Sequence, residues 1–411
     1  MRLGPRALIA AICGAELLTM LGFSAFPALL PKLLGLWELS NTEAGWIAGI
    51  FFAGYTVAVP VLVGLTDRVD PKRIYMVGAS LIVIGNLGFA LFADGFWSAL
   101  PFQLILGIGF AGTYMPGLKA LQDQVGATHS RAVAFYTSTF GAGVAMSYAI
   151  ADQLEALFGW QAIFWLAGAS AFLGLLLVLV VLPWNPPKKP EEPQPALLDF
   201  RPVAANRSTL AFSLCYFVHS WELFGVRGWV VAFLAFTAAF HGVSDPILSP
   251  AWVAFALTLL GMPASIWGNE LAMRYGRKKV VSVAMTLSAI TCVAVGLSAY
   301  VSYGLAVMLC LLHGALLASE SASVTAGALG NAKAGLRGST MAFHSVLGFG
   351  GGFLGPLLFG AVLDLAGDGS PLGWTIAYAH MALVMLAGPV VIRWLQPNDL
   401  PGDGAPRPVG T

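Results

Sequence analysis

The chain alternates between long apolar runs and short polar segments from residue 7 to residue 395. A helix that crosses a membrane needs about 20 mostly apolar residues, and twelve runs reach that length. The pattern therefore predicts an all-α membrane protein with twelve transmembrane helices. The runs cover residues 7–31, 43–64, 73–93, 97–119, 131–152, 160–183, 208–239, 249–272, 279–299, 302–326, 337–362 and 373–395. Because 208–239 is too long for one straight span, we expect a break near Gly225 or Gly228, or an extension beyond the bilayer.

An internal repeat relates the two halves of the chain at a constant offset of 206 residues. The polar segment VGLTDRVDPKR at 63–73 corresponds to NELAMRYGRKK at 269–279, and each segment separates two apolar runs. The repeat predicts two pseudo-symmetric bundles of six helices. Pairs that obey the offset are Glu16 and Glu222, Trp46 and Trp252, Leu65 and Leu271, Arg68 and Arg274, Lys72 and Lys278, and Arg131 and Arg337.

Polar, proline-rich segments mark the boundaries of these bundles. We expect an amino-terminal bundle at 1–183, a cytoplasmic linker at 184–206 and a carboxy-terminal bundle at 207–395. The Pro- and Gly-rich end, 396–411, predicts a disordered cytoplasmic tail.

The amino-acid composition is typical of a protein embedded in a lipid bilayer. Hydrophobic residues make up 58% of the chain and charged residues 10%, against about 25% charged in soluble proteins. The net charge of +1 argues against nucleic acid as a partner. The four cysteines lie in apolar runs without metal-binding spacing, so we expect neither a metal nor a cofactor.

Loop charge predicts the orientation. With the amino terminus inside, the outer loops contain Lys32 as their one basic residue, while the inner loops and tails contain nearly all the others. This is the positive-inside pattern, so both termini are expected to be cytoplasmic. We expect a multi-pass protein of the bacterial inner (plasma) membrane, and a monomer.

The two basic loops, together with twelve helices in two parallel halves, resemble the major facilitator superfamily. The signature of that family, roughly GxLaDRxGRKxx, is matched at Leu65, Asp67, Arg68, Lys72 and Arg73, whereas Val63 and Asp70 stand where glycine is usual. The second copy matches at Leu271, Ala272, Arg274, Gly276, Arg277 and Lys278, with Met273 in place of the aspartate. The resemblance implies a secondary transporter that works by alternating access.

In such a transporter these loops can form a cytoplasmic latch that breaks as the halves rock. The latch candidates are Asp67, Arg68, Lys72, Arg73, Arg274, Arg277 and Lys278. The alternative is a plain topology signal, which the missing acid favours for the second copy.

Other motifs of the family are absent. Gln103 stands where many proton-coupled members have an arginine, and the fifth run has Gly141 and Gly143 without the Gly-Pro of drug antiporters. The second and eighth runs have no interior arginine, which argues against nitrate.

Ionisable residues inside apolar runs are the candidates for transport chemistry, because each costs about 2.5–3.5 kcal/mol to insert. Glu16 and Glu222 are expected at similar depth, as substrate or proton sites or as carboxylates held by neighbouring donors. Glu320 and His313 lie seven residues apart on one helix face and form a candidate proton relay, although a buried histidine is more often simply hydrogen-bonded.

Arg227 is a candidate counter-ion for a substrate carboxylate, with a structural ion pair to Glu16 or Glu320 as the alternative. Tyr114, the repeat counterpart of Glu320, and Trp221 complete the substrate-binding set, with core packing as the commoner role of such aromatic residues.

The sequence thus predicts a proton-coupled transporter of a small polar or anionic organic solute. Two alternatives stay open: efflux of amphipathic drugs, and a non-transporting membrane assembly factor or sensor. An enzyme is not expected, since no nucleophile–base spacing or GxxxxGK[ST] motif occurs. The expected partners are the solute, protons and the lipid bilayer.

Overall fold

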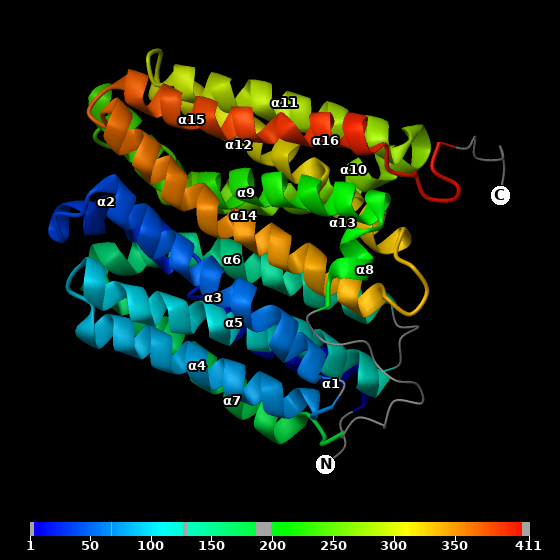
Figure 1. Ribbon diagram of the computed structural model, residues 1–411. Coiled ribbons are helices and arrows are strands. Elements are labelled where there is room, and N and C mark those ends of the chain that lie inside the picture. Colours follow the sequence, from blue (N-terminus) through cyan, green and yellow to red (C-terminus); the bar gives the residue numbers. More distant parts are fainter. Residues whose placement is uncertain (1–3, 67, 126–129, 186–198, 405–411) are drawn as a thin grey trace. The chain divides into compact units, whose positions relative to one another are not determined.

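A computed structural model describes residues 4–66, 68–125, 130–185 and 199–404 (Figure 1). These residues form helices that group into two compact units, the first comprising 1–39 and 46–197 and the second 40–45 and 198–411. The division after Leu197 falls inside the segment predicted as a linker.

The helices of the first unit follow the predicted runs. They are α1 (Pro5–Met20), α2 (Ala25–Leu36), α3 (Asn41–Leu65), α4 (Pro71–Phe92), α5 (Phe96–Val125), α6 (Ser130–Phe158) and α7 (Gln161–Val181), with the first residues of α3 grouped in the second unit. Helix α4 packs against α5 and α7, and α1 packs against α6 and α7. Glycines make the α4–α5 contact close: a Cβ on Gly78 would lie 2.7 Å from the carbonyl oxygen of Gly109.

The second unit repeats this order of helices. It contains α8 (Arg201–Ala204), α9 (Arg207–Phe240), α10 (Pro250–Tyr275), α11 (Arg277–Ser298), α12 (Tyr303–Ser319), α13 (Ser321–Gly330), α14 (Arg337–Ala366), α15 (Pro371–Met385) and α16 (Ala387–Leu395). Adding 206 to both bounds of α4 gives the bounds of α11, and adding it to α5 gives 302–331, the stretch that α12 and α13 occupy. The offset seen in the sequence is therefore also an offset of helices.

Eleven helical stretches in the described residues are long and apolar enough to cross a membrane. The remaining predicted run, 131–152, forms α6, a helix of 29 residues that carries Arg131, Asp152 and Glu155. Together they account for the twelve predicted runs.

Three of the predicted runs contain a helix break at a position that was not predicted. The first run breaks between α1 and α2, the tenth breaks at Glu320 between α12 and α13, and the twelfth breaks at Leu386 between α15 and α16. For the seventh run, a break near Gly225 or Gly228 was wrong, because α9 is continuous over 34 residues, and extension beyond the bilayer stays the prediction for this helix.

Serine hydroxyls on neighbouring helices accept hydrogen bonds from the backbone next to the first two of these breaks. The amide of Ser24 donates to Oγ of Ser147 (3.0 Å), and the amide of Ala322 donates to Oγ of Ser265 (3.3 Å). A backbone group without a partner in the apolar interior would be costly, so these serines stabilise the breaks.

Helices α9 and α14 pack against each other along much of their length (Figure 1). The contact depends on glycines of α14: a Cβ on Gly351 would overlap the carbonyl oxygen of Phe217, and one on Gly355 would overlap that of Trp221. A Cβ on the neighbouring Gly350, in contrast, would have no atom within 4 Å. Small residues here let the two backbones approach.

Adjacent glycines provide a matched test of this contact. We expect Gly351→Ala to destabilise the second unit by about 1–3 kcal/mol, because the methyl group meets backbone that cannot move aside. Gly350→Ala should be neutral or stabilising by up to about 1 kcal/mol, as alanine favours helix. Melting temperatures of the purified variants measure the difference, and equal values would contradict the packing argument.

Candidate functional site

In the first unit, Glu16 is a fully buried carboxylic acid on α1. Its Oε2 accepts a hydrogen bond of 2.7 Å from the hydroxyl of Tyr136 on α6, and that hydroxyl also lies 3.0 Å from the carbonyl oxygen of Tyr114 on α5. The other carboxyl oxygen, Oε1, has no hydrogen-bond partner among the described residues. Glu16 is thus held by one donor and retains a free oxygen.

In the second unit, Glu222 on α9 occupies the equivalent position and is also fully buried. Its Oε2 accepts a hydrogen bond of 2.9 Å from Ser288 on α11. Its Oε1 lies 3.8 Å from Nε2 of His313 on α12, and neither of these two atoms has a hydrogen-bond partner among the described residues. Thr291 lies 3.2 Å from the other ring nitrogen of His313 and orients the ring.

A second histidine–carboxyl pair lies close by. Nδ1 of His219 on α9 is 2.8 Å from Oε1 of Glu320, and both side chains are fully buried. The ring of His219 stacks on Tyr216, which in turn stacks on His344. Glu320 is the residue at which α12 gives way to α13.

Two histidine–carboxyl pairs therefore connect α9 with the α12 segment. His219 and Glu222 are one turn apart on α9, and His313 and Glu320 are seven residues apart, so each helix contributes one acid and one histidine. Such a pair can bind or release a proton while keeping charge compensated. The predicted shared face of His313 and Glu320 holds, but each faces a partner on α9 instead of the other.

The ligand atoms of Glu222, Cys292 and His313 lie within 4.8 Å of one another. Nε2 of His313 and Oε1 of Glu222 are 3.8 Å apart, whereas two ligands each ~2.1 Å from a tetrahedral zinc ion lie ~3.4 Å apart.

The predicted substrate-binding residues are distributed over both units. Arg227 lies on α9, partly exposed, five residues after Glu222. Tyr114 lies on α5, where its ring packs against Tyr136 and Phe140. Trp221 is 8% exposed, and its Nε1 donates to Nε2 of His380 (3.3 Å).

The first basic loop contains a residue that the motif comparison set aside. Asp70 accepts hydrogen bonds from the amides of Lys72 (2.9 Å) and Asn185 (2.7 Å), so it caps α4 and holds the segment after α7. The ammonium of Lys72, 3% exposed, donates to the carbonyl oxygens of Leu179 and Leu182. Basic residues favour such helix carboxyl ends.

The remaining latch candidates of this loop lie at the surface. Arg68 and Arg73 are exposed, and the guanidinium of Arg73 lies 5.6 Å from the ring of Trp184. Asp67 lies outside the described residues.

In the second basic loop, where Met273 stands in place of the signature aspartate, Asp403 supplies an acid that pairs with a loop arginine. Nε and Nη2 of Arg277 donate to Asp403 (2.9 and 3.2 Å), in a pair whose side chains are 2% and 4% exposed. Nη1 of Arg277 donates to Asn269 and to the carbonyl oxygen of Ser323. Asp399 accepts a hydrogen bond from the amide of Lys278 (2.8 Å).

Residues 396–404, predicted as part of a disordered tail, instead pack on the second unit through these contacts. The sequence missed the pairing because Asp403 is 126 residues from Arg277, so no local pattern links them. Arg274, the third candidate of this loop, is exposed, with its guanidinium 5.2 Å from the ring of Tyr275.

The buried clasp formed by Arg277 and Asp403 can be tested by removing its acid. We expect Asp403→Ala to cost about 3–5 kcal/mol, because the guanidinium of Arg277 would be buried without its counter-charge. The combination of Arg277→Met with Asp403→Leu should recover much of this loss. Thermal unfolding of the three proteins measures both effects.

The control is an Asp–Arg pair at the surface. A hydrogen bond from Arg201 lowers the pKa of the Asp199 carboxyl, yet the side chain of Arg201 is 89% exposed. Asp199→Ala should leave the melting temperature unchanged, since exposed pairs contribute little. An equal effect of both aspartate changes would show that burial of the clasp is unimportant.

Comparison with known proteins places this geometry in a family context. The family model of the Major Facilitator Superfamily matches residues 12–251 and 246–411. The uncharacterized MFS-type transporter YbcL of Bacillus subtilis is 25% identical over 280 residues, 66% of this chain and 68% of that protein.

Two further relatives match over shorter stretches. Human monocarboxylate transporter 11 is 30% identical over 174 residues, 41% of this chain and 36% of that protein. The niacin transporter NiaP of Acinetobacter baylyi is 26% identical over 160 residues, 38% of this chain and 35% of that protein. The matched stretches thus span only about a third of these two proteins.

Solved structures share the fold at low identity. A bacterial homolog of the human lysosomal transporter Spinster, inward-facing and unoccupied, superposes with a TM-score of 0.70 at 16% identity, covering 95% of each chain. The nucleoside transporter NupG superposes with a TM-score of 0.72 at 14% identity, covering 95% of this chain and 99% of that one. The predicted all-α membrane fold is confirmed.

Proposed function

Since the chain belongs to the major facilitator superfamily of secondary transporters, we propose that it moves a small polar or anionic organic solute by alternating access, coupled to protons. Membership also excludes an enzyme, in agreement with the sequence. The proposal goes beyond membership in three respects: the class of solute, the coupling ion and the residues that carry both.

The observation that carries proton coupling is the pair of histidine–carboxyl contacts between α9 and the α12 segment. Glu222 and His313 face each other at 3.8 Å with unsatisfied atoms, while Glu320 and His219 are already hydrogen-bonded at 2.8 Å. Adding or removing a proton changes how strongly each pair attracts, because in a low-dielectric interior an uncompensated charge is costly. Proton binding is thereby linked to the packing of two helices.

Glu16 is the corresponding candidate in the first unit. Its Oε1, which has no hydrogen-bond partner among the described residues, can bind a proton or accept a hydrogen bond from the solute. Tyr114, whose carbonyl oxygen shares the Tyr136 hydroxyl, then lines the same site.

An anionic solute is favoured by Arg227, a guanidinium on a membrane-spanning helix one and a half turns beyond Glu222. A planar fork of donors binds a carboxylate through two parallel hydrogen bonds. Two relatives are named for monocarboxylates and for niacin, which supports an organic acid as the class to test first.

The orientation and the latch complete the proposal. The positive-inside pattern of the basic loops supports cytoplasmic termini. The proposal includes a bacterial inner membrane as the location and a monomer as the working unit. The latch residues of both basic loops stabilise one conformation and release it during transport. In the first loop they are Asp67, Arg68, Lys72 and Arg73, and in the second Arg274, Arg277 and Lys278.

Substrate identification comes first, because every other assay depends on it. A thermal-shift screen of organic acids, nucleosides and amphipathic drugs on the purified protein reveals ligands as a concentration-dependent rise in melting temperature. Stabilisation by carboxylates supports the proposal, whereas stabilisation by uncharged amphipathic compounds alone would favour efflux of drugs.

If transport is coupled to protons, replacing the coupling carboxyl by an amide should abolish accumulation of the solute against its gradient but leave exchange of the solute across the membrane. In proteoliposomes with an imposed pH gradient, we expect at least one of Glu16→Gln, Glu222→Gln and Glu320→Gln to abolish accumulation while solute exchange continues. Glu38→Gln, a change at an exposed loop carboxyl, is the matched control. If all three variants still accumulate solute against its gradient, these carboxyls do not couple transport to protons.

A role of Arg227 as counter-ion predicts a specific loss in Arg227→Lys. We expect the dissociation constant of the solute to rise about 10- to 100-fold, since one charge-assisted hydrogen bond contributes about 1.5–3 kcal/mol, with unchanged folded yield. Unchanged affinity, together with a loss of stability in Arg227→Ala that a second change at Glu16, Glu222 or Glu320 restores, would assign Arg227 to a structural ion pair.

A further inference from the structure

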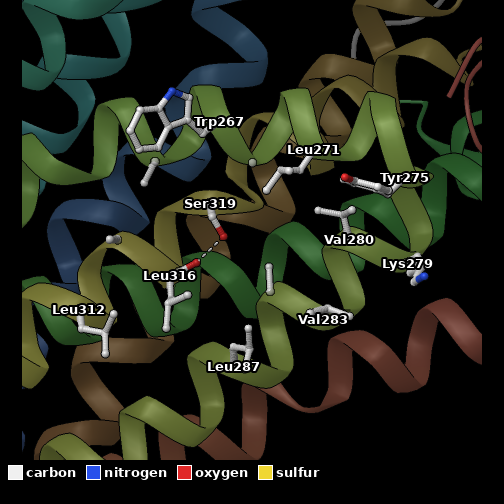
Figure 2. A pocket seen from close by; sticks show the side chains of 14 residues that line it. Trp267, Leu271, Tyr275, Lys279, Val280, Val283, Leu287, Leu312, Leu316 and Ser319 are labelled. Atoms are coloured by element: carbon white, nitrogen blue, oxygen red, sulfur yellow. Dashed lines mark hydrogen bonds between the residues drawn. The ribbon is translucent and has the colours of Figure 1, made fainter. Parts of the chain in front are cut away.

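A groove of about 470 Å³ runs along the surface of the second unit between α10, α11 and α12 (Figure 2). Fourteen residues line it, and Lys279 is the one charged residue among them. Several of the apolar side chains that line it are well exposed, including Trp267 (71%) and Leu312 (50%). None of its lining residues belongs to either histidine–carboxyl pair.

The groove has an apolar end and a basic end. Figure 2 shows Leu312 and Leu287 at one end and Tyr275 with Lys279 at the other. From Lys279 to Leu287 helix α11 rises about 12 Å, at ~1.5 Å per residue. Half of a bilayer's hydrocarbon core is about 15 Å thick, so the groove extends through most of one leaflet and its basic end lies near the membrane surface.

The basic residues near this end of the groove differ in their protein partners. Arg277 and Lys278 are matched by Asp403 and Asp399. Lys279, in contrast, makes no hydrogen bond or ion pair with any residue in the described part of the chain. The guanidinium of Arg274 lies over the ring of Tyr275, which lines the same end.

We propose that this groove binds one anionic phospholipid, with an acyl chain along its apolar walls and the headgroup phosphate at Lys279 and Arg274. Long basic side chains place their charge at the membrane surface while their methylene groups lie along apolar contacts. Attraction to anionic lipid contributes about 1 kcal/mol per basic residue near the surface.

The bound chain reaches the helix break that contains Glu320. Ser319 lines the groove as the last residue of α12, and its hydroxyl donates to the carbonyl oxygen of Leu316 (2.7 Å; dashed in Figure 2). Gly268 on the opposite wall packs directly against the backbone of Ser319. The lipid therefore contacts the segment next to one histidine–carboxyl pair, although its binding does not depend on the proposed transport function.

Native mass spectrometry of the purified full chain, titrated with phosphatidylglycerol or phosphatidylethanolamine, tests the site. We expect Lys279→Gln to weaken phosphatidylglycerol binding about fivefold, the factor that ~1 kcal/mol represents, with little change for phosphatidylethanolamine. Ala315→Phe, which fills the groove, should weaken both lipids. Lys333→Gln and Ala387→Phe, changes of the same kind at exposed positions outside the groove, should bind both lipids as the wild type does.

Melting temperatures without added lipid should match the wild type, which excludes misfolding as the cause. The proposal is overturned if both groove variants retain wild-type affinity for phosphatidylglycerol. It is also overturned if the groove variants and their controls lose affinity equally, because the lipid would then bind the surface without a defined site. A change of oligomeric mass in Ala315→Phe at constant lipid affinity would assign the groove to a second copy.

Discussion

The cost of placing charge in the bilayer interior governs the structure of this protein. Each fully buried carboxyl has a partner within its own unit: Tyr136 for Glu16, Ser288 and His313 for Glu222, and His219 for Glu320. Water is not there to compensate a missing partner, so these contacts determine which helix faces pack together. The same contacts involve the carboxyl and imidazole groups that we propose couple transport to protons.

Backbone groups obey the same constraint as side chains. Where α1 gives way to α2 and where α12 gives way to α13, the hydroxyls of serines on neighbouring helices accept hydrogen bonds from backbone amides at the break. At the membrane surface, Lys72 binds the carbonyl oxygens at the end of α7, and Arg277 is enclosed by Asp403, Asn269 and a carbonyl oxygen. Glycines on α4, α5 and α14 then allow helix backbones to approach.

Much of the fold could be predicted from the sequence because membrane helices are recognised by length and composition. The offset of 206 predicted the correspondence of α4 with α11, and the structure reproduces it in the helix bounds. The positions of helix breaks were harder to predict. A glycine indicates flexibility, but it does not show where a hydroxyl of a neighbouring helix can bind a backbone amide that has lost its helical partner. Gly225 and Gly228 therefore lie in a continuous helix, whereas Glu320, with no glycine beside it, marks a break.

The sequence by itself determined the family, the membrane spans, the repeat and the set of costly charges, because these depend on composition, spacing and local motif. Only the tertiary structure decided the partners. It paired Glu222 with His313, Glu320 with His219, and Arg277 with Asp403, residues 91, 101 and 126 positions apart in the chain. A buried charge in the sequence indicates that a partner is needed, but which one it meets depends on helix rotation and depth, and these are set by packing over the whole unit.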